Sequence, residues 1–304
     1  MQAPDILALG EAMVEFMEIP EGAPRRLYQQ GFGGDTSNTI IAAARQGART
    51  GYITAVGGDA FGQDLTALWQ AEGVATSAVK VSPRDPTGVY FVKPHASGRS
   101  FSYARRGSAA SLYRPEDLPE DLIGRAKVLH SSALSQAISP TMRAAVRRAA
   151  ELAKSSGTLF SYDTNLRLNL WSLEEAKTAI EDILPLADII FPSDDEAELL
   201  TGLSHPDALL DHYLGYGARV VALKRGAEGV IVATPDARFA VPAAPSAPVD
   251  STGAGDSFAG AFLAYYVETG DAALAGQRAA RVAAGTVSGF GAVDPIPRRD
   301  QILA

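Results

Sequence analysis

The sequence predicts an α/β fold, with helices covering both faces of a mainly parallel β-sheet. Short β-branched runs alternate with amphipathic helical stretches over most of the chain, which is the pattern of strand-helix repeats. The length of 304 residues leaves ample chain for one large core. Neither an internal repeat nor a flexible interdomain linker interrupts the pattern, so one core is expected.

Six short apolar or β-branched runs are predicted to be the central strands, because each has helical periodicity nearby. In chain order these runs are 6–9, 50–56, 127–130, 158–162, 188–191 and 219–223. Helices are predicted at 37–46, 62–72, 140–155, 173–184 and 194–200, and in two successive stretches after Gly253. Pro140 follows Ser139, a favourable pairing of N-cap and first helical residue.

Two segments, 11–30 and 87–107, break this alternation. The second predicts a β-hairpin turning at Ala96, Ser97 and Gly98. Together the segments predict a small sheet, or lid, inserted into a core made of 1–10, 31–86 and 108–304. Because a small sheet that stands off the core leaves edges and a face in water, we expect lids to pair between subunits in a homo-oligomer.

Composition excludes several classes of protein. The net charge of −8 and the pI near 5.1 oppose electrostatic binding to nucleic acid or to an anionic membrane, although a small anionic substrate needs only a local positive site. The chain has no cysteine, and its four histidines lack metal-site spacing. Without a long apolar run or a basic N-terminal region, we expect a cytoplasmic protein.

The strongest motif is a glycine-rich turn running into an apolar stretch. Gly253, Ala254 and Gly255 allow consecutive backbone N–H groups to approach an anion, and a helix N-terminus adds partial positive charge. This arrangement suits a phosphoryl group. Asp256, which follows directly, is interpreted either as an N-cap or first-turn acid that complements the helix dipole, or as a general base beside the anion.

A second glycine-rich segment occurs near the N-terminus. Gly33 and Gly34 permit close approach of the backbone to a ligand, while Asp35 and Asn38 supply hydrogen bonds to hydroxyl groups. The alternative is an ordinary turn with a helix cap. The sequence has no P-loop, no dinucleotide-binding fingerprint, no protein-kinase signature and no nucleophile elbow.

Together the two segments resemble the paired signatures of the ribokinase-like (PfkB) carbohydrate kinases, in order and in spacing. The resemblance covers essentially the whole chain. It implies a three-layer α/β/α core with a β-sheet lid, ATP as phosphoryl donor, Mg²⁺ as cofactor and Asp256 as catalytic base. Some relatives also bind a monovalent cation such as K⁺ near the residues that match Asp250 and Thr252.

The resemblance also implies roles for residues between the two signatures. Glu196 matches an acid that organises Mg²⁺ through water, whereas Ser193 stands where many members have Asn. The acidic helix start at 194–195 has a plain alternative, because acids favour helix N-termini. Three further residues match the nucleotide loop, which is otherwise interpreted as a solvated basic turn: Lys224, Gly226 and Gly229.

Two further segments bear on the substrate. Phe101, Tyr103 and Arg105 share one strand face, and Asn165 and Arg167 follow a predicted strand end, where ligands of parallel sheets bind. Two arginines are suited to hold a carboxylate, although Arg105 is alternatively a surface charge. Within the family, this combination of segments most resembles the 2-keto-3-deoxygluconate kinases. The resemblance implies that the following residues line the substrate pocket: Gly34, Tyr90, Tyr103, Arg105 and Arg167.

The expected reaction is therefore ATP-dependent phosphorylation of a sugar acid, 2-keto-3-deoxygluconate, at its terminal hydroxyl. Fructokinases carry related arginine-containing segments, so Arg167 discriminates poorly between the two substrates. A fructokinase or ribokinase-type enzyme is the nearest alternative. A non-catalytic sugar-binding regulator on the same fold is the alternative from another class.

Overall fold

The computed structural model describes residues 3–19, 26–95 and 98–303. Its main sheet has nine strands in the order β13-β12-β11-β10-β9-β8-β1-β4-β5. The seven strands β11, β10, β9, β8, β1, β4 and β5 run parallel to one another. The strands are β1 (Ile6–Leu9), β4 (Thr50–Gly57), β5 (Val79–Ser82), β8 (Val128–Ser132), β9 (Leu159–Asp163), β10 (Ile189–Phe191), β11 (Val220–Lys224), β12 (Val230–Ala233) and β13 (Arg238–Val241).

All six predicted central strands are confirmed, whereas β5, β12 and β13 were not predicted from the sequence. These three lie at the two edges of the sheet, and β12 and β13 extend it as an antiparallel pair. Edge strands carry a weaker hydrophobic pattern because only part of their surface is buried. In β13 the first three of its four residues are exposed.

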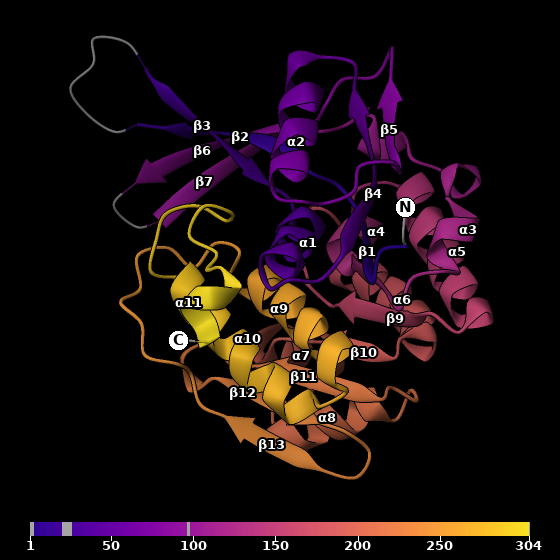
Figure 1. The fold of residues 1–304 in the computed structure, drawn as a ribbon, viewed down its shortest axis with the longest axis vertical. Coiled ribbons are helices and arrows are strands. Elements are labelled where there is room, and N and C mark those ends of the chain that lie inside the picture. Colours follow the sequence, from indigo (N-terminus) through magenta and orange to yellow (C-terminus); the bar gives the residue numbers. More distant parts are fainter. Residues whose placement is uncertain (1–2, 20–25, 96–97, 304) are drawn as a thin grey trace.

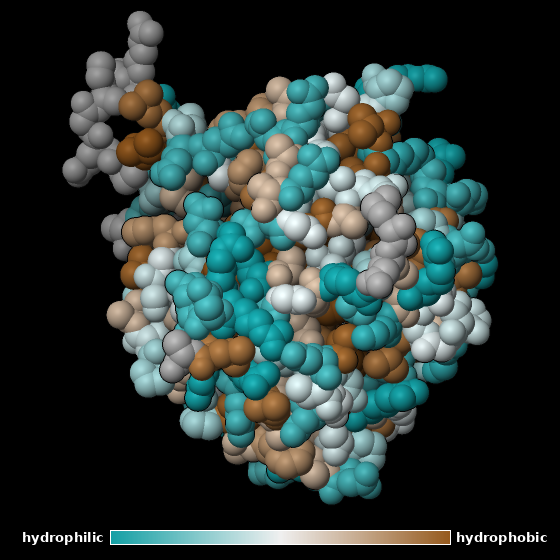
Figure 2. Space-filling model, viewed as in Figure 1, coloured by the Kyte–Doolittle hydropathy of each residue, from teal (hydrophilic) through white to brown (hydrophobic). Residues whose placement is uncertain are grey.

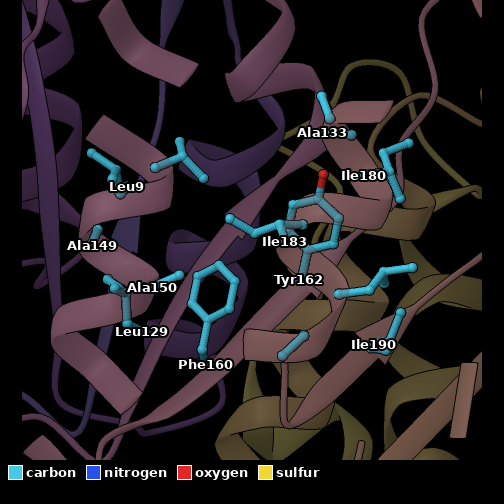
Figure 3. Packing of buried hydrophobic residues seen from close by; sticks show 14 of the residues in the cluster. Leu9, Leu129, Ala133, Ala149, Ala150, Phe160, Tyr162, Ile180, Ile183 and Ile190 are labelled. Atoms are coloured by element: carbon cyan, nitrogen blue, oxygen red, sulfur yellow. The ribbon is translucent and has the colours of Figure 1, made fainter. Parts of the chain in front are cut away.

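Helices pack on both faces of the sheet (Figure 1). The face formed by Ile6 and Ala8 packs with α1 (Asp35–Arg45), α2 (Ala60–Ala71), α9 (Ala254–Thr269) and α10 (Ala272–Thr286). The opposite face, formed by Leu7 and Leu9, packs with α5 (Pro140–Ser156), α6 (Leu173–Ile183), α7 (Asp194–Thr201) and α8 (Pro206–Leu214), as Figure 3 shows for part of this core. Because strand side chains alternate between faces, β1 serves both cores.

The predicted start of α5 is confirmed in detail. The Ser139 hydroxyl accepts a hydrogen bond from the N–H of Met142 at 3.0 Å, and Pro140 occupies the first turn. Gly157 ends the helix in the left-handed conformation, with φ of 78°. Such an N-cap is worth about 1 kcal/mol. Local sequence therefore sets both ends of this helix.

The lid is a separate four-stranded sheet in the order β3-β2-β6-β7, standing away from the core in Figure 1. Its strands are β2 (Met13–Glu18), β3 (Tyr28–Gly33), β6 (Val89–His95) and β7 (Gly98–Ala104). The predicted hairpin is confirmed as the antiparallel pair of β6 and β7, although residues 96 and 97 of its turn lie outside the described residues. In Figure 2, hydrophobic residues are visible where the lid projects from the core.

Among the residues that the structure describes, no helix combines the length and the apolar character required to cross a membrane.

Candidate active site

A cavity of about 1010 Å³ lies between the lid and the carboxyl ends of the parallel strands. Its walls come from the lid, from the start of α1, from the residues after β9, β10 and β11, and from the turn before α9. Parallel sheets bind ligands at this edge because the strand ends and the helix N-termini meet there. The cavity thus brings together segments from most of the chain.

The glycine-rich turn forms one wall of this cavity. Gly253 is the N-cap of α9 with φ of 76°, and a Cβ atom there would lie 2.8 Å from the carbonyl oxygen of Ala292. The Asp250 carboxylate fixes the turn, because it accepts hydrogen bonds from the N–H groups of Thr252 at 3.0 Å and Gly291 at 3.1 Å. The first-turn N–H groups of α9 therefore face a site suited to an anion.

Asp256 is an acid in the first turn of α9, as one form of the capping interpretation predicts, but it is not the N-cap residue. The cap residue is Gly253, and no side chain makes the cap hydrogen bond. The Asp256 carboxylate instead lines the cavity and accepts a hydrogen bond of 2.8 Å from Nδ2 of Asn38. Removal from water raises the pKa of Asp256 to about 7, and the nearby carboxylate of Asp35 acts in the same direction.

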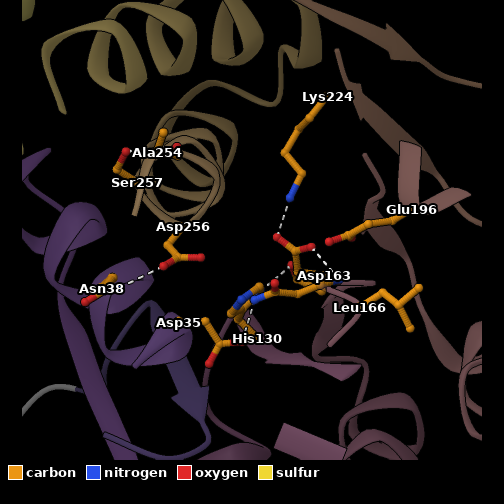
Figure 4. A network of polar contacts seen from close by, with 12 residues as sticks. Asp35, Asn38, His130, Asp163, Leu166, Glu196, Lys224, Ala254, Asp256 and Ser257 are labelled. Carbon is orange, nitrogen blue, oxygen red and sulfur yellow. Dashed lines mark hydrogen bonds and ion pairs between the residues drawn. The ribbon is translucent and has the colours of Figure 1, made fainter. Parts of the chain in front are cut away.

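Four acidic side chains gather around this position with one lysine, as Figure 4 shows: Asp35, Asp163, Glu196, Asp256 and Lys224. The Lys224 ammonium donates to Oδ2 of Asp163 at 2.6 Å. Asn165 links two of the acids, since its backbone N–H donates to Asp163 and its side-chain amide donates to Asp35, both at 3.0 Å. Burial also raises the pKa of the Asp35 carboxyl and of the Glu196 carboxyl.

Every predicted substrate residue lines the cavity: Gly33, Gly34, Asn38, Tyr90, Tyr103, Arg105, Asn165, Arg167 and Asp256. The two glycines are required by close contacts. A Cβ atom on Gly33 would lie 2.2 Å from the Tyr90 hydroxyl, and one on Gly34, where φ is 129°, would lie 2.4 Å from the Glu11 carbonyl oxygen. Gly34 is also the N-cap of α1, so the helix begins two residues earlier than predicted.

The two arginines have different surroundings. The Arg105 guanidinium pairs with the buried carboxylate of Glu11 and lies 5.7 Å from the ring centre of Tyr103. Only 10% of its side chain is exposed, so the interpretation of Arg105 as a surface charge is wrong. Arg167 is half-exposed and donates to Glu196 at 3.1 Å. Both guanidinium groups line the same cavity.

The predicted nucleotide residues divide between two connected cavities. Ser193, Lys224, Gly226 and the two turn glycines line the main cavity, whereas Gly229 does not. Gly229 lines a neighbouring, mostly apolar cavity of about 510 Å³. This cavity shares Lys224, Gly226, Ser251 and Gly255 with the first. Its walls come from α9, including Phe258, from small side chains of α10 and from residues 243–248. This second cavity, called the apolar slot below, has room for a flat aromatic base. It lies beside the glycine-rich turn at residues 253–255, called the anion turn below.

The structure also fits a magnesium ion held mainly by phosphate oxygens and water. No group of three or more acidic or histidine side chains capable of holding a metal occurs within the described residues. Glu196 is a mostly buried carboxylate at the cavity, and Asp163, which also lines the cavity, is already paired with Lys224. Because Mg²⁺ commonly keeps several waters and takes few protein ligands, one acid acting through water suffices.

Three features of the site were not predicted: the pairing of Glu11 with Arg105, the pairing of Asp163 with Lys224, and the apolar slot. Asp163 and Glu11 each follow a predicted strand, so their positions at the carboxyl edge of the sheet carried a signal. The sequence carried no signal that these acids pair with Arg105 and Lys224, because each pair joins residues that are distant in the sequence.

Comparison with known proteins is consistent with this geometry. The family model described as pfkB family carbohydrate kinase matches residues 3–299. The 2-dehydro-3-deoxygluconokinase of Thermoproteus tenax is 35% identical, and Fructokinase-2 of Solanum habrochaites is 36% identical, each match covering 86% of this chain and 82% of the relative. A putative ribokinase II from E. coli, solved in complex with ATP and Mg²⁺, superposes with a TM-score of 0.91 at 29% identity, covering 99% of this chain and 98% of that chain.

Proposed function

Because the chain belongs to the PfkB family of carbohydrate kinases and has its ribokinase-like fold, we propose that it phosphorylates 2-keto-3-deoxygluconate with ATP. The product is 2-keto-3-deoxy-6-phosphogluconate, formed at the terminal hydroxyl. One observation carries the choice of substrate: two arginines line the cavity that also holds Asp256 and the anion turn. A sugar acid presents both a carboxylate and a terminal hydroxyl to such a site.

Asp256 acts as the general base in this proposal. Asn38 holds one carboxylate oxygen, and the carboxylate lies at the cavity wall where the substrate hydroxyl would approach. The first-turn N–H groups at Gly253, Ala254 and Gly255 stabilise negative charge on the transferred phosphoryl group. Most of the catalysis then comes from positioning and electrostatics, as is general for phosphoryl transfer.

The nucleotide would lie along the second wall. Its base enters the apolar slot, its phosphates reach the anion turn, and Ser193, Lys224, Gly226 and Gly229 line its path. Mg²⁺ neutralises phosphate charge when bound, with Glu196 orienting its waters. We further propose a monovalent cation such as K⁺ beside the turn held by Asp250.

Self-association through the lid is also part of the proposal. Tyr28 and Phe91 contact each other with ring centres 5.8 Å apart, yet both are exposed, at 41% and 39%. A second copy of the lid would cover these rings on a sheet that otherwise leaves edges in water.

The alternative substrate is a neutral ketose such as fructose, which the similarity to a plant fructokinase favours equally. To separate them, ADP release with Mg²⁺ and ATP is measured against 2-keto-3-deoxygluconate, its galactonate epimer, fructose, ribose and adenosine. Preference for the keto-deoxy acids supports the proposal. Preference for a neutral sugar would support kinase activity but contradict the sugar-acid substrate. Absence of turnover on the whole panel would favour a sugar-binding regulator.

Arg105→Ala is expected to lower kcat/KM for the sugar acid about 10- to 100-fold more than for fructose, because a charge-assisted hydrogen bond is lost. The substitution leaves the buried Glu11 with Ser108 as a hydrogen-bond partner but without its cation, and it lowers stability. The ratio of the two substrates, measured on one preparation, is independent of the folded fraction. Arg106→Ala, an exposed neighbour, is the matched control. Equal losses on both substrates would count against carboxylate recognition.

Activity is expected to depend on pH through Asp256. A base must be unprotonated, and the pKa of Asp256 is raised to about 7, so kcat/KM for the sugar should rise with pH and level off above 7. A pH profile from 5 to 9 at saturating ATP tests this. A profile that is flat down to pH 5 would contradict the assignment of Asp256.

A further inference from the structure

Every basic side chain that lines the main cavity within the described residues is paired with an acid. Arg105, Arg167 and Arg225 pair with acids that line the cavity, and Arg225 also pairs with the exposed Glu228. Lys224 pairs with Asp163, and the side chains of this pair are only 18% and 5% exposed. An anionic ligand therefore meets cations that already have partners, and it must compete with the protein's own carboxylates for them.

Lys224 lies beside the anion turn. Its Nζ atom lies 2.6 Å from Oδ2 of Asp163 and 3.4 Å from the position that a Cβ atom on Gly255 would occupy. The ammonium thus stands between a buried carboxylate and the backbone that would hold a phosphoryl group. A lysine has a long flexible stem, so a small rotation suffices to change its partner.

Asp163 is fixed independently of Lys224. Its Oδ1 atom accepts the N–H of Asn165, and the Asn165 side chain is tied in turn to Asp35 of α1. If Lys224 moves away, the Asp163 carboxylate stays at the end of β9 with its charge uncovered. One member of the pair is therefore anchored, and the other is free to exchange partners.

We propose that Asp163 is a temporary partner for Lys224, which it releases to the phosphoryl group of the bound nucleotide. Asp163 holds the ammonium beside the anion turn in the empty site, where the surrounding acids would otherwise repel a phosphate. Nucleotide binding then moves the cation to the phosphate oxygens, and the uncovered Asp163 charge makes Asp256 a stronger proton acceptor. Base strength and nucleotide binding are coupled in this way. This inference rests on the proposed kinase function.

The charges around Asp256 have the signs that this coupling requires. Asn38 donates to it from α1, and Asp35 and Tyr90 face it from α1 and β6. Burial raises the pKa of Asp256 most, and the negative charges of Asp35 and then Asp163 raise it further. The positive charge of Lys224 lowers it. Removing either member of the pair should therefore shift the protonation of Asp256 in opposite directions. Opposite shifts show that both charges act on Asp256, and the nucleotide-binding measurement then tests the exchange of partners.

The test uses Asp163→Asn and Lys224→Met, which nearly preserve side-chain shape while removing one charge each. Protonation of Asp256 is followed by infrared carboxyl bands, with Asp256→Asn as the reference that identifies them. We expect the midpoint to fall by about one pH unit in Asp163→Asn and to rise by about one in Lys224→Met. Asp5→Asn and Lys127→Met, from a pair joined at 3.0 Å that flanks the starts of β1 and β8, are matched controls expected to leave it unchanged.

Nucleotide affinity is measured in parallel by calorimetry, with the magnesium complex of a non-hydrolysable ATP analogue. Lys224→Met should weaken binding about 10-fold or more, since a charge-assisted bond to phosphate is lost. Asp163→Asn should bind as tightly as the unaltered protein or more tightly, because Lys224 no longer has a competing partner.

Equal or same-direction shifts of Asp256, or unchanged nucleotide affinity in Lys224→Met, would overturn the exchange of partners. Neither measurement needs turnover, so the result is separate from the substrate panel. Absence of turnover with every sugar of that panel would contradict the proposed kinase function. An active kinase in which the two variants do not shift the protonation midpoint of Asp256 in opposite directions would contradict only this inference. Thermal unfolding of each variant verifies that it is folded.

Discussion

Asp256→Asn is expected to lower kcat by about 10²- to 10⁴-fold while leaving both ligands bound, because it removes the group that accepts the hydroxyl proton. The amide has the same shape, and its oxygen can still accept the hydrogen bond from Asn38. Folding should therefore be nearly unchanged. Single-turnover kinetics measures the chemical step, and calorimetry with the ATP analogue and with the sugar measures binding.

A variant that keeps near-normal turnover would remove Asp256 from the mechanism. Loss of sugar binding in parallel with turnover would instead indicate that the carboxylate mainly holds the substrate. The Asn38→Ala variant complements this experiment. It removes the donor to Asp256, so it should move the acid limb of the pH profile upward without abolishing activity, because that hydrogen bond lowers the pKa of Asp256.

Gly253→Ala is expected to reduce kcat/KM about 10²- to 10³-fold, the usual cost of losing an anion-stabilising N–H group. The added Cβ would lie 2.8 Å from the carbonyl oxygen of Ala292, so the turn must shift away from the position that holds the phosphoryl group. Alanine also tolerates the φ of 76° poorly. Steady-state kinetics with varied ATP and varied sugar measures the loss.

Gly270→Ala separates strain from function. Gly270 ends the same helix with φ of 71°, and a Cβ atom there would have nothing within 4 Å. Both variants carry similar backbone strain, about 1 to 2 kcal/mol, but only Gly253 lies at the cavity. Equal activity losses in the two variants would mean that the effect of Gly253→Ala is on stability and not on the anion turn.

Much of the fold could be predicted from local patterns in the sequence. The six central strands have runs of apolar residues that are buried on both faces, and α5 has its cap and its terminating glycine within a few residues of its ends. The start of α1 was placed too late. Asp35 and Thr36 are polar, yet tertiary packing buries both. A prediction based only on the pattern of hydrophobic residues does not assign polar residues such as these to the buried start of a helix.

The sequence by itself determined the fold class, the family and the predicted substrate residues at the cavity, because motifs and side-chain periodicity are local properties of the chain. Tertiary structure alone decided the partners of the charged groups. The hydrogen bond from Asn38 to Asp256 spans 218 residues of sequence, and the bond from Lys224 to Asp163 spans 61. Electrostatic interactions depend on distance in space and on burial, which folding sets, so the raised pKa of Asp256 and the shared lysine follow from the fold.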